Sequence, residues 1–581
     1  MSPDLINKTK IPPLIPTPHD DGDLGTLIHC FPFGHLDYCR MEQESELVIR
    51  VKLQISDIDC IKAAHLLCMT DLKKGKGETW SQSEFLYKGD SYFEYRVQLE
   101  KPGTFRFRIK YSLDDGQTWR RDRLSFFTVI VEPRGFKQVK LYSLIPRISG
   151  SFSDWIELLP HIKSMGFNTI HLLPITFMDK SKSPYAAYDL FSPDPDYGNP
   201  GDNRPLLVQF EEFVQKARES GIKLCFDLVL NHVGVTSQIA KTCPDWIVPD
   251  EKEDDGFLRA GAMHGQEWVQ WRDLGLLNYD NPDKEQRRSL WAYMSQYVHF
   301  WSFYAHYTGG MVRLDNLHSS NEKFLVSVLE STREKYPNLS VFAELFTEHK
   351  NLERLMKKYA LHFLLATPWG AKFAPYLRNY ITYIHSIKNK VKYIFPISTH
   401  DSGSPAEEYG SIQSTIPRYV ISMLYTTGHT GIVQGCEYCL EKKVEFIGHQ
   451  EPLLEGHTPR LAPFFRMINN LASTYPHFSN HSDLIFIDQD HDSILGALRP
   501  GRPEDGCDFL LLANLDIHNY QTLIVKGKMP YSEVEAIDMA HNKRKVHLPR
   551  FGLNITMEPC GIRIFKLPHP NRVEKSLLPI C

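Results

Sequence analysis

The stretch Gly309-Gly310-Met311-Val312-Arg313-Leu314-Asp315-Asn316-Leu317-His318 places an Asp two residues after an Arg, where an apolar run of strand length ends. Three other stretches have the same form, in which an apolar run stops at polar residues. They are Asp227-Leu228-Val229-Leu230-Asn231-His232, Val341-Phe342-Ala343-Glu344 and Ser398-Thr399-His400-Asp401. Strands that end in carboxylates, in order along one chain, are what a (β/α)8 barrel with a site at its strand C-termini requires.

The composition narrows the class of protein. The chain has 581 residues, enough for two to four domains, and its formal net charge is −4. This charge gives no electrostatic case for a nucleic-acid partner. The 11 Cys are odd in number and spread along the chain, so we expect neither a disulfide framework nor a zinc site. Because no apolar run is long enough to span a bilayer and Met1–Asp23 shows no secretory signal, we expect a cytoplasmic protein without a membrane partner.

The periodicity of apolar residues divides the chain into segments. Residues 1–26 form a polar, Pro-rich leader. Within residues 27–135, alternating runs such as Tyr92–Leu99 predict an N-terminal antiparallel β-sandwich, and within residues 479–581 runs such as Phe509–Ala513 predict a C-terminal one.

Between these sandwiches, residues 136–478 alternate between strand and helix patterns. Asp154 can cap a helix that Gly166 ends, and a buried strand, Thr169–Pro174, follows it. So many repeated βα units favour a closed eight-stranded barrel. Residues 233–281 interrupt the pattern and predict a loop-like inserted domain, which would form one wall of a cleft.

The four stretches resemble, in the same order, the motifs of the α-amylase superfamily (glycoside hydrolase family 13). Arg313-Leu314-Asp315 is similar to its strand-four R-x-D, and Glu344 falls at the acid of its strand five. Asp227…Asn231-His232 is similar to its D-x-x-x-N-H, and His400-Asp401 to its H-D after strand seven. The resemblance covers about residues 140–475. It implies a (β/α)8 barrel and a retaining α-glucan-active enzyme.

Within the superfamily, the segments around Asp315, Glu344 and Asp401 look most like the glucanotransferase half of the eukaryotic-type glycogen debranching enzyme. The complete debranching enzyme has a second, α-1,6-glucosidase half, for which this chain has no room. Three residues depart from the superfamily pattern. Met311 stands where Gly is usual, Thr399 replaces the usual Asn before His-Asp, and Cys436 lies within the strand-eight motif.

The resemblance assigns the catalytic roles to three carboxyl residues. Asp315 would attack the anomeric carbon, Glu344 would act as general acid and then base, and Asp401 would bind the 2- and 3-hydroxyls of the distorted ring. Retaining glycosidases place the first two groups roughly 5–5.5 Å apart. We expect neighbouring negative charge and partial burial to raise the pKa of Glu344. Arg313 would hold Asp315 ionised through a charge-assisted hydrogen bond.

Other residues would hold the substrate. Tyr185 would stack on the sugar, His232 and His400 would donate to its hydroxyls, and His318 would contact the acceptor-side glucose. Each assignment has a structural alternative: an Arg-x-Asp is often an ion pair, and His318 can simply begin a helix. Many relatives bind calcium through the residue matching Asn231, but no calcium-loop spacing is visible in Asp250–Asp255. We therefore expect no cofactor and no metal, with calcium at Asn231 as the alternative.

These motifs predict cleavage of α-1,4-glucosidic bonds in an α-glucan or malto-oligosaccharide. The sequence favours 4-α-glucanotransferase activity and leaves amylase-type hydrolysis open. A glycogen-branching or maltosyl transferase is the alternative within the class. A non-catalytic amylase-like binding subunit is the alternative from another class. The sequence leaves the oligomeric state open.

Overall fold

The computed structural model describes residues 27–31, 38–54, 58–71, 80–121, 126–134, 138–264, 267–479, 483–488 and 491–568. The expected leader, residues 1–26, lies outside them. The chain forms two compact units. One comprises residues up to 135 together with 333–338 and 348–360, and the other comprises 136–332, 339–347 and 361–581.

The first unit contains two β-sheets that share one core. One sheet has the order β1 (Leu27–Phe31), β3 (Glu46–Gln54), β7 (Tyr92–Gln98), β6 (Leu86–Gly89). The other has the order β2 (Tyr38–Glu42), β10 (Phe127–Glu132), β8 (Gly103–Ser112), β4 (His65–Thr70), β5 (Ser81–Glu84), with β9 (Arg120–Arg121) beside β8. Inward residues of both sheets, such as Ile49 and Phe107, form one apolar cluster. Strand β2 pairs parallel with β10, which departs from the expected antiparallel pairing. The described part of this unit also contains the helices α1 (Ile58–Lys62) and α8 (His349–Tyr359).

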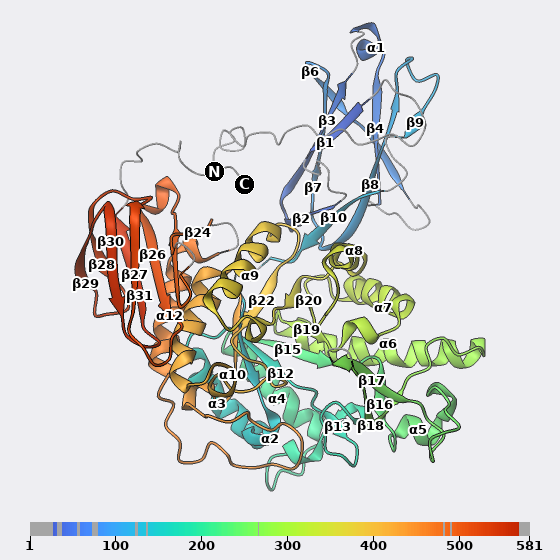
Figure 1. Cartoon of the computed structure of the whole chain (residues 1–581). Helices are drawn as coiled ribbons and strands as arrows, with labels where there is room; N and C mark the ends of the chain where they lie inside the picture. The colour runs from blue at the N-terminus through green and yellow to red at the C-terminus, as the bar shows by residue number, and fades with distance from the viewer. Residues whose placement is uncertain are drawn as a thin grey trace. The chain divides into compact units, whose positions relative to one another are not determined.

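Eight parallel strands close a barrel in the second unit, which confirms the predicted barrel (Figure 1). Their order is β11 (Lys140–Leu144), β12 (Thr169–Leu172), β15 (Lys223–Leu228), β19 (Met311–Leu314), β20 (Ser340–Ala343), β21 (Phe363–Leu365), β22 (Tyr393–Pro396), β23 (Thr430–Val433). Strand β11 pairs with β23 and completes the circle. Buried side chains including Leu141, Met311 and Ile394 fill the interior.

Helices connect the barrel strands. They are α2 (Pro146–Ser149), α3 (Phe152–Ser164), α4 (Leu206–Glu219), α6 (Lys284–Tyr307), α7 (Glu322–Lys335), α9 (Ala374–Ile387), α10 (Pro405–Tyr409), α11 (Thr415–Val420) and α12 (Ala462–Thr474). Ser151, not Asp154, is the N-cap of α3. Asp154 occupies the third helical position, and its carboxylate accepts the Ser151 backbone N–H at 2.7 Å.

The insertion after β15 is more regular than the sequence suggests. Strands β16 (His232–Gly234), β18 (Glu267–Leu276) and β17 (Arg259–His264) form an antiparallel sheet in that order. In the chain, the short helix α5 (Gln238–Thr242) lies between β16 and β17. The prediction of a loop-like segment is wrong at these strands. Gly261 and Gly275 lie at the paired positions, and glycine weakens the strand signal of a sequence. A separate hairpin pairs β13 (Thr176–Met178) with β14 (Ala187–Pro193).

The C-terminal segment again contains β-sheets. One has the order β24 (Ile485–Phe486), β25 (Ile494–Arg499), β26 (Cys507–Asn514), β31 (Ile562–Pro568), β28 (Val534–Asp538), β29 (Arg544–Leu548). A second pairs β27 (Gln521–Lys528) with β30 (Phe551–Met557). Residues of both, such as Leu512 and Leu553, share one core. No helix in the described part of the chain is long and apolar enough to cross a bilayer.

Candidate active site

The barrel brings the four sequence motifs to one end. Asp315 directly follows β19, Glu344 directly follows β20, and Asp401 follows β22 by five residues. Because the strands are parallel and in neighbouring positions, their C-terminal ends meet at one rim. The close packing that this requires explains Gly310: a Cβ there would come within 1.9 Å of the Leu224 carbonyl oxygen. The unexpected Met311 is fully buried and fills the barrel interior.

One guanidinium joins three carboxyl groups at this rim. Arg313 Nη1 donates to Asp227 Oδ2 at 2.6 Å and to Asp315 Oδ1 at 3.1 Å, and its Nη2 donates to Glu344 Oε2 at 2.8 Å. The Arg313 side chain is only 2 % exposed. We call Asp227, Arg313, Asp315 and Glu344 the floor of the site. Three carboxylates around one buried cation give the floor an excess of negative charge.

Asn316, which follows Asp315 in the chain, adds a contact to the floor. Asn316 adopts a left-handed backbone conformation with φ 43°. In this conformation its backbone N–H donates to Glu344 Oε2 at 3.1 Å. The turn after the nucleophile candidate thus fixes the carboxylate on the neighbouring strand.

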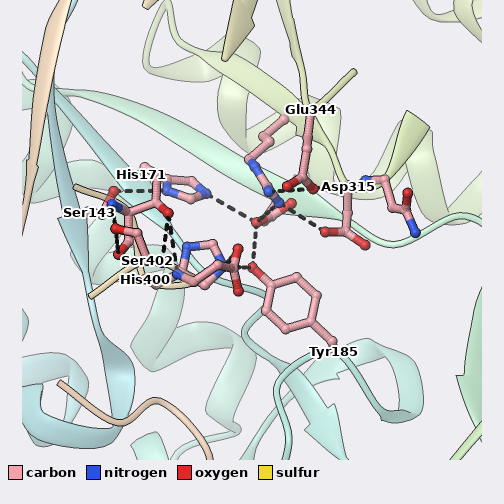
Figure 2. Close-up of polar contacts among 12 residues, drawn as sticks. Ser143, His171, Tyr185, Asp315, Glu344, His400 and Ser402 are labelled. Atoms are coloured by element: carbon pink, nitrogen blue, oxygen red, sulfur yellow. Dashed lines mark hydrogen bonds and ion pairs between the residues drawn. The ribbon is translucent and has the colours of Figure 1, made fainter. Parts of the chain in front are cut away.

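A layer of ring side chains extends from the floor (Figure 2). Tyr185 Oη donates to Asp227 Oδ2 at 2.9 Å and lies 2.6 Å from His400 Nε2. His171 Nε2 lies 3.1 Å from Asp227 Oδ2, and its Nδ1 lies 3.1 Å from Ser143 Oγ. The Tyr185 and His400 rings are stacked, with centroids 5.6 Å apart. His400 Nε2 also lies 3.0 Å from Asp401 Oδ2, so this layer connects Asp401 to the floor.

A cleft of about 570 Å³ opens above these residues. Six of the residues expected at the site line it: Tyr185, His232, Asp315, His318, Glu344 and Asp401. Arg313 and His400 lie beneath the lining and contact it. The structure therefore brings all eight expected site residues together.

Several residues of the site were not predicted from the sequence. His171 and Asp227 were not assigned roles, although each is a polar residue within an otherwise apolar strand, which is a usable signal. Trp271, Trp369 and Phe446 line the cleft as well. Trp271 lies in β18 of the insertion, and Trp369 and Phe446 come from connecting segments, where no periodic pattern marks an inward-facing residue.

Burial and charge shift the pKa values of the floor carboxyls in opposite directions. Burial raises the pKa of Asp315 well above its usual value, the charges of Glu344 and Asp227 raise it further, and Arg313 only partly opposes them. For Asp227, burial again favours the neutral form, but Arg313 and His171 outweigh it and lower the pKa to about 2. The raised pKa is thus found at Asp315, whereas the sequence analysis expected one at Glu344, and burial and charge favour a proton on Asp315.

The remaining polar residues of the site differ in their protonation. Asp401 has a lowered pKa: burial favours its neutral form, but the charge and hydrogen bond of His400, followed by the charge of Arg313, outweigh it. The Asp401 side chain is 54 % exposed, so it reaches into the cleft. Burial lowers the pKa of His232 to about 4 and also lowers that of His318. Both imidazoles are therefore neutral near pH 7 and each can donate one hydrogen bond.

Residues 439–461 form a second side of the cleft, which we call the wall. They contain no helix or strand, although this part of the chain is fully described. The wall is held through its backbone: the Lys443 N–H donates to Glu407 Oε2 at 2.8 Å, and the Gly448 N–H donates to the Lys182 carbonyl at 3.0 Å. Phe446 packs edge-on against His400, with ring centroids 5.2 Å apart. Lys443 Nζ donates to the Asp401 carbonyl oxygen at 3.1 Å.

Thr399, one of the departures from the superfamily pattern, has a structural explanation. Thr399 Oγ1 accepts the backbone N–H groups of Asp401 and Ser402 at 3.3 and 3.2 Å. Thr399 thus fixes the turn that carries Asp401. Cys436, another departure, is spaced with Cys439 as a CxxC pair, and burial raises the pKa of both thiols. Raised pKa values disfavour the reactive thiolate.

Asn231 is the residue at which calcium is the alternative to a metal-free site. The side-chain amide of Asn231 is buried, and neither its oxygen nor its nitrogen has a hydrogen-bond partner among the described residues. In the same part of the chain, no three His, Cys, Asp or Glu residues group as metal ligands. The amide oxygen of Asn231 alone does not supply the six to eight oxygen ligands that calcium takes.

Solved structures share this architecture. The chain resembles a maltogenic α-amylase of Thermotoga neapolitana with a TM-score of 0.59 and 16% identity, over 75% of this chain and 99% of the other. It resembles the α-amylase of Geobacillus thermoleovorans with a TM-score of 0.59 and 15% identity, over the same shares of the two chains. At these identities the likeness concerns the fold.

Sequence relatives act on α-glucans by their names. The α-1,4-glucan:maltose-1-phosphate maltosyltransferase of Chlorobaculum tepidum is 25% identical over 427 residues, which is 65% of this chain and 58% of the relative. The corresponding protein of Cereibacter sphaeroides is 24% identical over 419 residues, again 65% and 58% of the two chains. The match thus spans less than two thirds of these relatives.

Together the closed barrel, the strand-end carboxyls and these relatives point to one class: the chain is similar to enzymes of the α-amylase superfamily. Within it, residues 135–250 match the family model of the glycogen debranching enzyme, glucanotransferase domain. This match confirms the resemblance to the debranching-enzyme glucanotransferase half, on a segment that ends before Asp315 and Glu344.

Proposed function

We propose that the cleft cleaves α-1,4-glucosidic bonds with retention of configuration, in an α-glucan or malto-oligosaccharide. The observation that carries the proposal is the contact of Arg313 with both Asp315 and Glu344. It holds two carboxyl groups from adjacent strands at one edge of a cleft, which is the arrangement that glycoside cleavage through an oxocarbenium-like state uses.

In the first half of the proposed reaction, an Asp315 oxygen attacks the anomeric carbon as the bond to the leaving oxygen breaks. Glu344 gives its proton to that oxygen, so the shortened glucan leaves as an alcohol. In the second half, Glu344 takes a proton from the acceptor hydroxyl, which displaces Asp315 and restores both groups. Asp315 must be ionised at the start, so the proton held at the floor belongs on Glu344 when substrate is bound.

The ring layer would orient the sugar for this reaction. Asp401, ionised and exposed to the cleft, would accept hydrogen bonds from the ring hydroxyls. His232 is neutral and can donate to a hydroxyl, and Tyr185 offers its ring face to the same sugar. His400 would act from beneath, through its contacts with Tyr185 and Asp401. His318 would contact the acceptor side, together with Phe346, whose ring lies 5.7 Å from it.

The acceptor decides between transfer and hydrolysis. The names of the relatives, which are maltosyltransferases, and the glucanotransferase family model support a sugar hydroxyl as the acceptor. We therefore propose 4-α-glucanotransferase activity, with amylase-type hydrolysis as the second candidate. A branching or maltosyl transferase remains the alternative in the class, and a non-catalytic binding subunit the alternative outside it.

The finer architecture is part of the proposal. We infer that residues 27–135 and 479–581 are β-sandwiches flanking the catalytic segment 136–478, because in each the described sheets share an apolar core. Residues 233–281 are proposed as the inserted domain. The chemistry needs no cofactor, and calcium bound through Asn231 is kept only as a testable alternative. The compartment proposed from the sequence is the cytoplasm.

Incubation of the purified chain with maltoheptaose tests the function. Transfer gives both longer and shorter oligomers with little gain in reducing ends, whereas hydrolysis gives a steady gain. Asp315→Asn removes the nucleophile and should lower the rate about a thousandfold or more. Asp273→Asn is the matched control, because Asp273 lines the cleft outside the floor. Full activity in Asp315→Asn would exclude the assigned mechanism.

A further inference from the structure

Two aromatic side chains at the start of α9 are exposed to solvent. Phe373 is the N-cap residue of α9 and is 66 % exposed, and Tyr376 in the first turn is 67 % exposed. Their ring centroids lie 6.5 Å apart. Residues three apart lie on one face of a helix, and exposed Asn379 continues the same face with a polar side chain. We call Phe373, Tyr376 and Asn379 the platform.

The segment that carries the platform is fixed in place. Arg418 is 6 % exposed and donates to the carbonyl oxygens of both Ala371 and Lys372. Its guanidinium stacks on the Tyr409 ring at 4.1 Å. Lys372 Nζ also pairs with Glu408 Oε2 at 3.2 Å. A buried arginine therefore holds the backbone just before Phe373, so the two exposed rings are presented by a preorganised loop.

The same segment forms part of the cleft. Leu365, Thr367 and Trp369 line it, and Phe373 follows Trp369 by four residues. Strand β21 leads into this segment, so α9 begins at the strand C-terminal face, where the floor lies. One short connection thus carries an aromatic residue inside the cleft and two outside it.

We propose that the platform binds an α-glucan chain that continues beyond the cleft. The inference rests on the proposed function for its ligand, and on the connection that carries Trp369 in the cleft and Phe373 and Tyr376 a few residues further along. Aromatic faces provide large, rigid apolar area for the apolar faces of sugar rings, and Tyr376 and Asn379 can hydrogen-bond hydroxyls. The platform then favours long glucans over short oligosaccharides.

Binding can be measured without turnover in an Asp315→Asn background, by electrophoresis in gels with and without glycogen. We expect glycogen to retard this protein, Phe373→Ala/Tyr376→Ala to lose most of the retardation, and Phe373→Trp/Tyr376→Trp to keep it. Tyr520→Ala/Phe551→Ala is the matched control, because those aromatics are 71 % and 60 % exposed on the C-terminal sheets. Equal retardation of all variants, or none in the parent, would overturn the proposal.

Kinetics of the chain with intact Asp315 give the second readout. The double alanine variant should raise KM for glycogen about tenfold, with kcat and the KM for maltotriose unchanged. A parallel rise for maltotriose overturns the proposal, because it would place the two rings at the reaction itself. Sedimentation of the parent chain and of the double alanine variant tests whether the rings bind a second copy of the chain instead. A dimer that is lost only in the double variant would assign the rings to self-association and overturn the proposal.

These arms also separate the two proposals. A chain that is inert on every glucan but is retarded by glycogen through the platform would disprove the proposed reaction and leave the platform standing. If the chain turns over maltoheptaose but the parent and the double alanine variant have the same KM for glycogen, the platform is disproved and the proposed reaction stands.

Discussion

The floor and the wall of the cleft are built by different physical means. The floor is four side chains from the ends of three neighbouring strands, held together by one buried guanidinium. The wall is an irregular segment, residues 439–461, fastened by backbone groups to Glu407 and Lys182 and by side-chain contacts such as the Glu451–Arg147 ion pair. Chemistry that requires fixed charges is placed on the rigid frame, whereas the shape of the cleft is set by a connecting segment that can vary without disturbing the barrel.

The largest expected effect comes from removing the cation of the floor. Arg313→Met leaves buried carboxylates without compensation, so we expect the free energy of unfolding to fall by about 3–5 kcal/mol. The rate on maltoheptaose should fall about a thousandfold, because Asp315 and Glu344 lose their common support. Denaturant unfolding and initial rates of the folded fraction measure the two effects.

Arg378→Met is the control for that experiment. Arg378 donates to both carboxylate oxygens of Asp488 at 3.0 Å, away from the floor, so its loss should destabilise the chain while the folded fraction stays active. Arg313→Lys keeps the charge and serves as the variant that folds. If Arg313→Lys and Arg313→Met both work at the wild-type rate, the floor is structural and the contrast with the wall fails.

A smaller effect on stability is expected when the pH is lowered, because His232, the first residue of the insertion strand β16, is buried near the floor. Burial lowers the pKa of His232 to about 4, from about 6.5 in an unfolded chain. Between these values the unfolded state binds the extra proton, so this contribution to stability is present above pH 6.5 and is lost as pH falls to 4. The loss amounts to about 3 kcal/mol for this group.

His232→Gln should therefore flatten the pH dependence of thermal unfolding between pH 6.5 and 4. His518→Gln is the matched control, since His518 is exposed in the C-terminal segment. A variant whose melting temperature falls with acid as steeply as that of the wild type would show that His232 titrates normally.

The smallest effect tests how the wall acts on the site. Lys443→Met removes the donor to the Asp401 carbonyl and a positive charge that helps to lower the Asp401 pKa. We expect KM to rise about fivefold with little change in kcat, because the group is partly exposed. Lys443→Arg should recover most of the loss, and Lys442→Met, on the exposed neighbour, should show none. A loss in kcat alone would mean that Lys443 serves the chemical step.

The contrast also explains which parts of the site sequence reasoning could reach. Asp315, Glu344 and Asp401 end apolar runs, so their placement follows from strand periodicity and parallel topology. Trp369 and Phe446 lie on connections without a period, and only tertiary contacts bring them to the cleft. Strand β21 was not predicted because three residues carry too little pattern. The strands of the insertion were hidden by their glycines.

The electrostatics followed the same division. The sequence indicated that Arg313 would contact Asp315, and the structure shows that contact. It did not indicate that the same guanidinium also serves Asp227, the closest of its three partners at 2.6 Å. Because one cation is divided among three anions, Asp315 receives only part of it, and its pKa rises instead of falling. Sums of this kind depend on distances that a sequence does not contain.

The excess negative charge of the floor has a consequence for inhibitors. With one guanidinium among three carboxyl groups, the floor is short of positive charge, and a sugar mimic with a protonated ring nitrogen would supply it. Such a compound should bind more tightly than its neutral carbon analogue. Its advantage should grow as pH rises through the raised pKa of Asp315, as long as the nitrogen itself stays protonated.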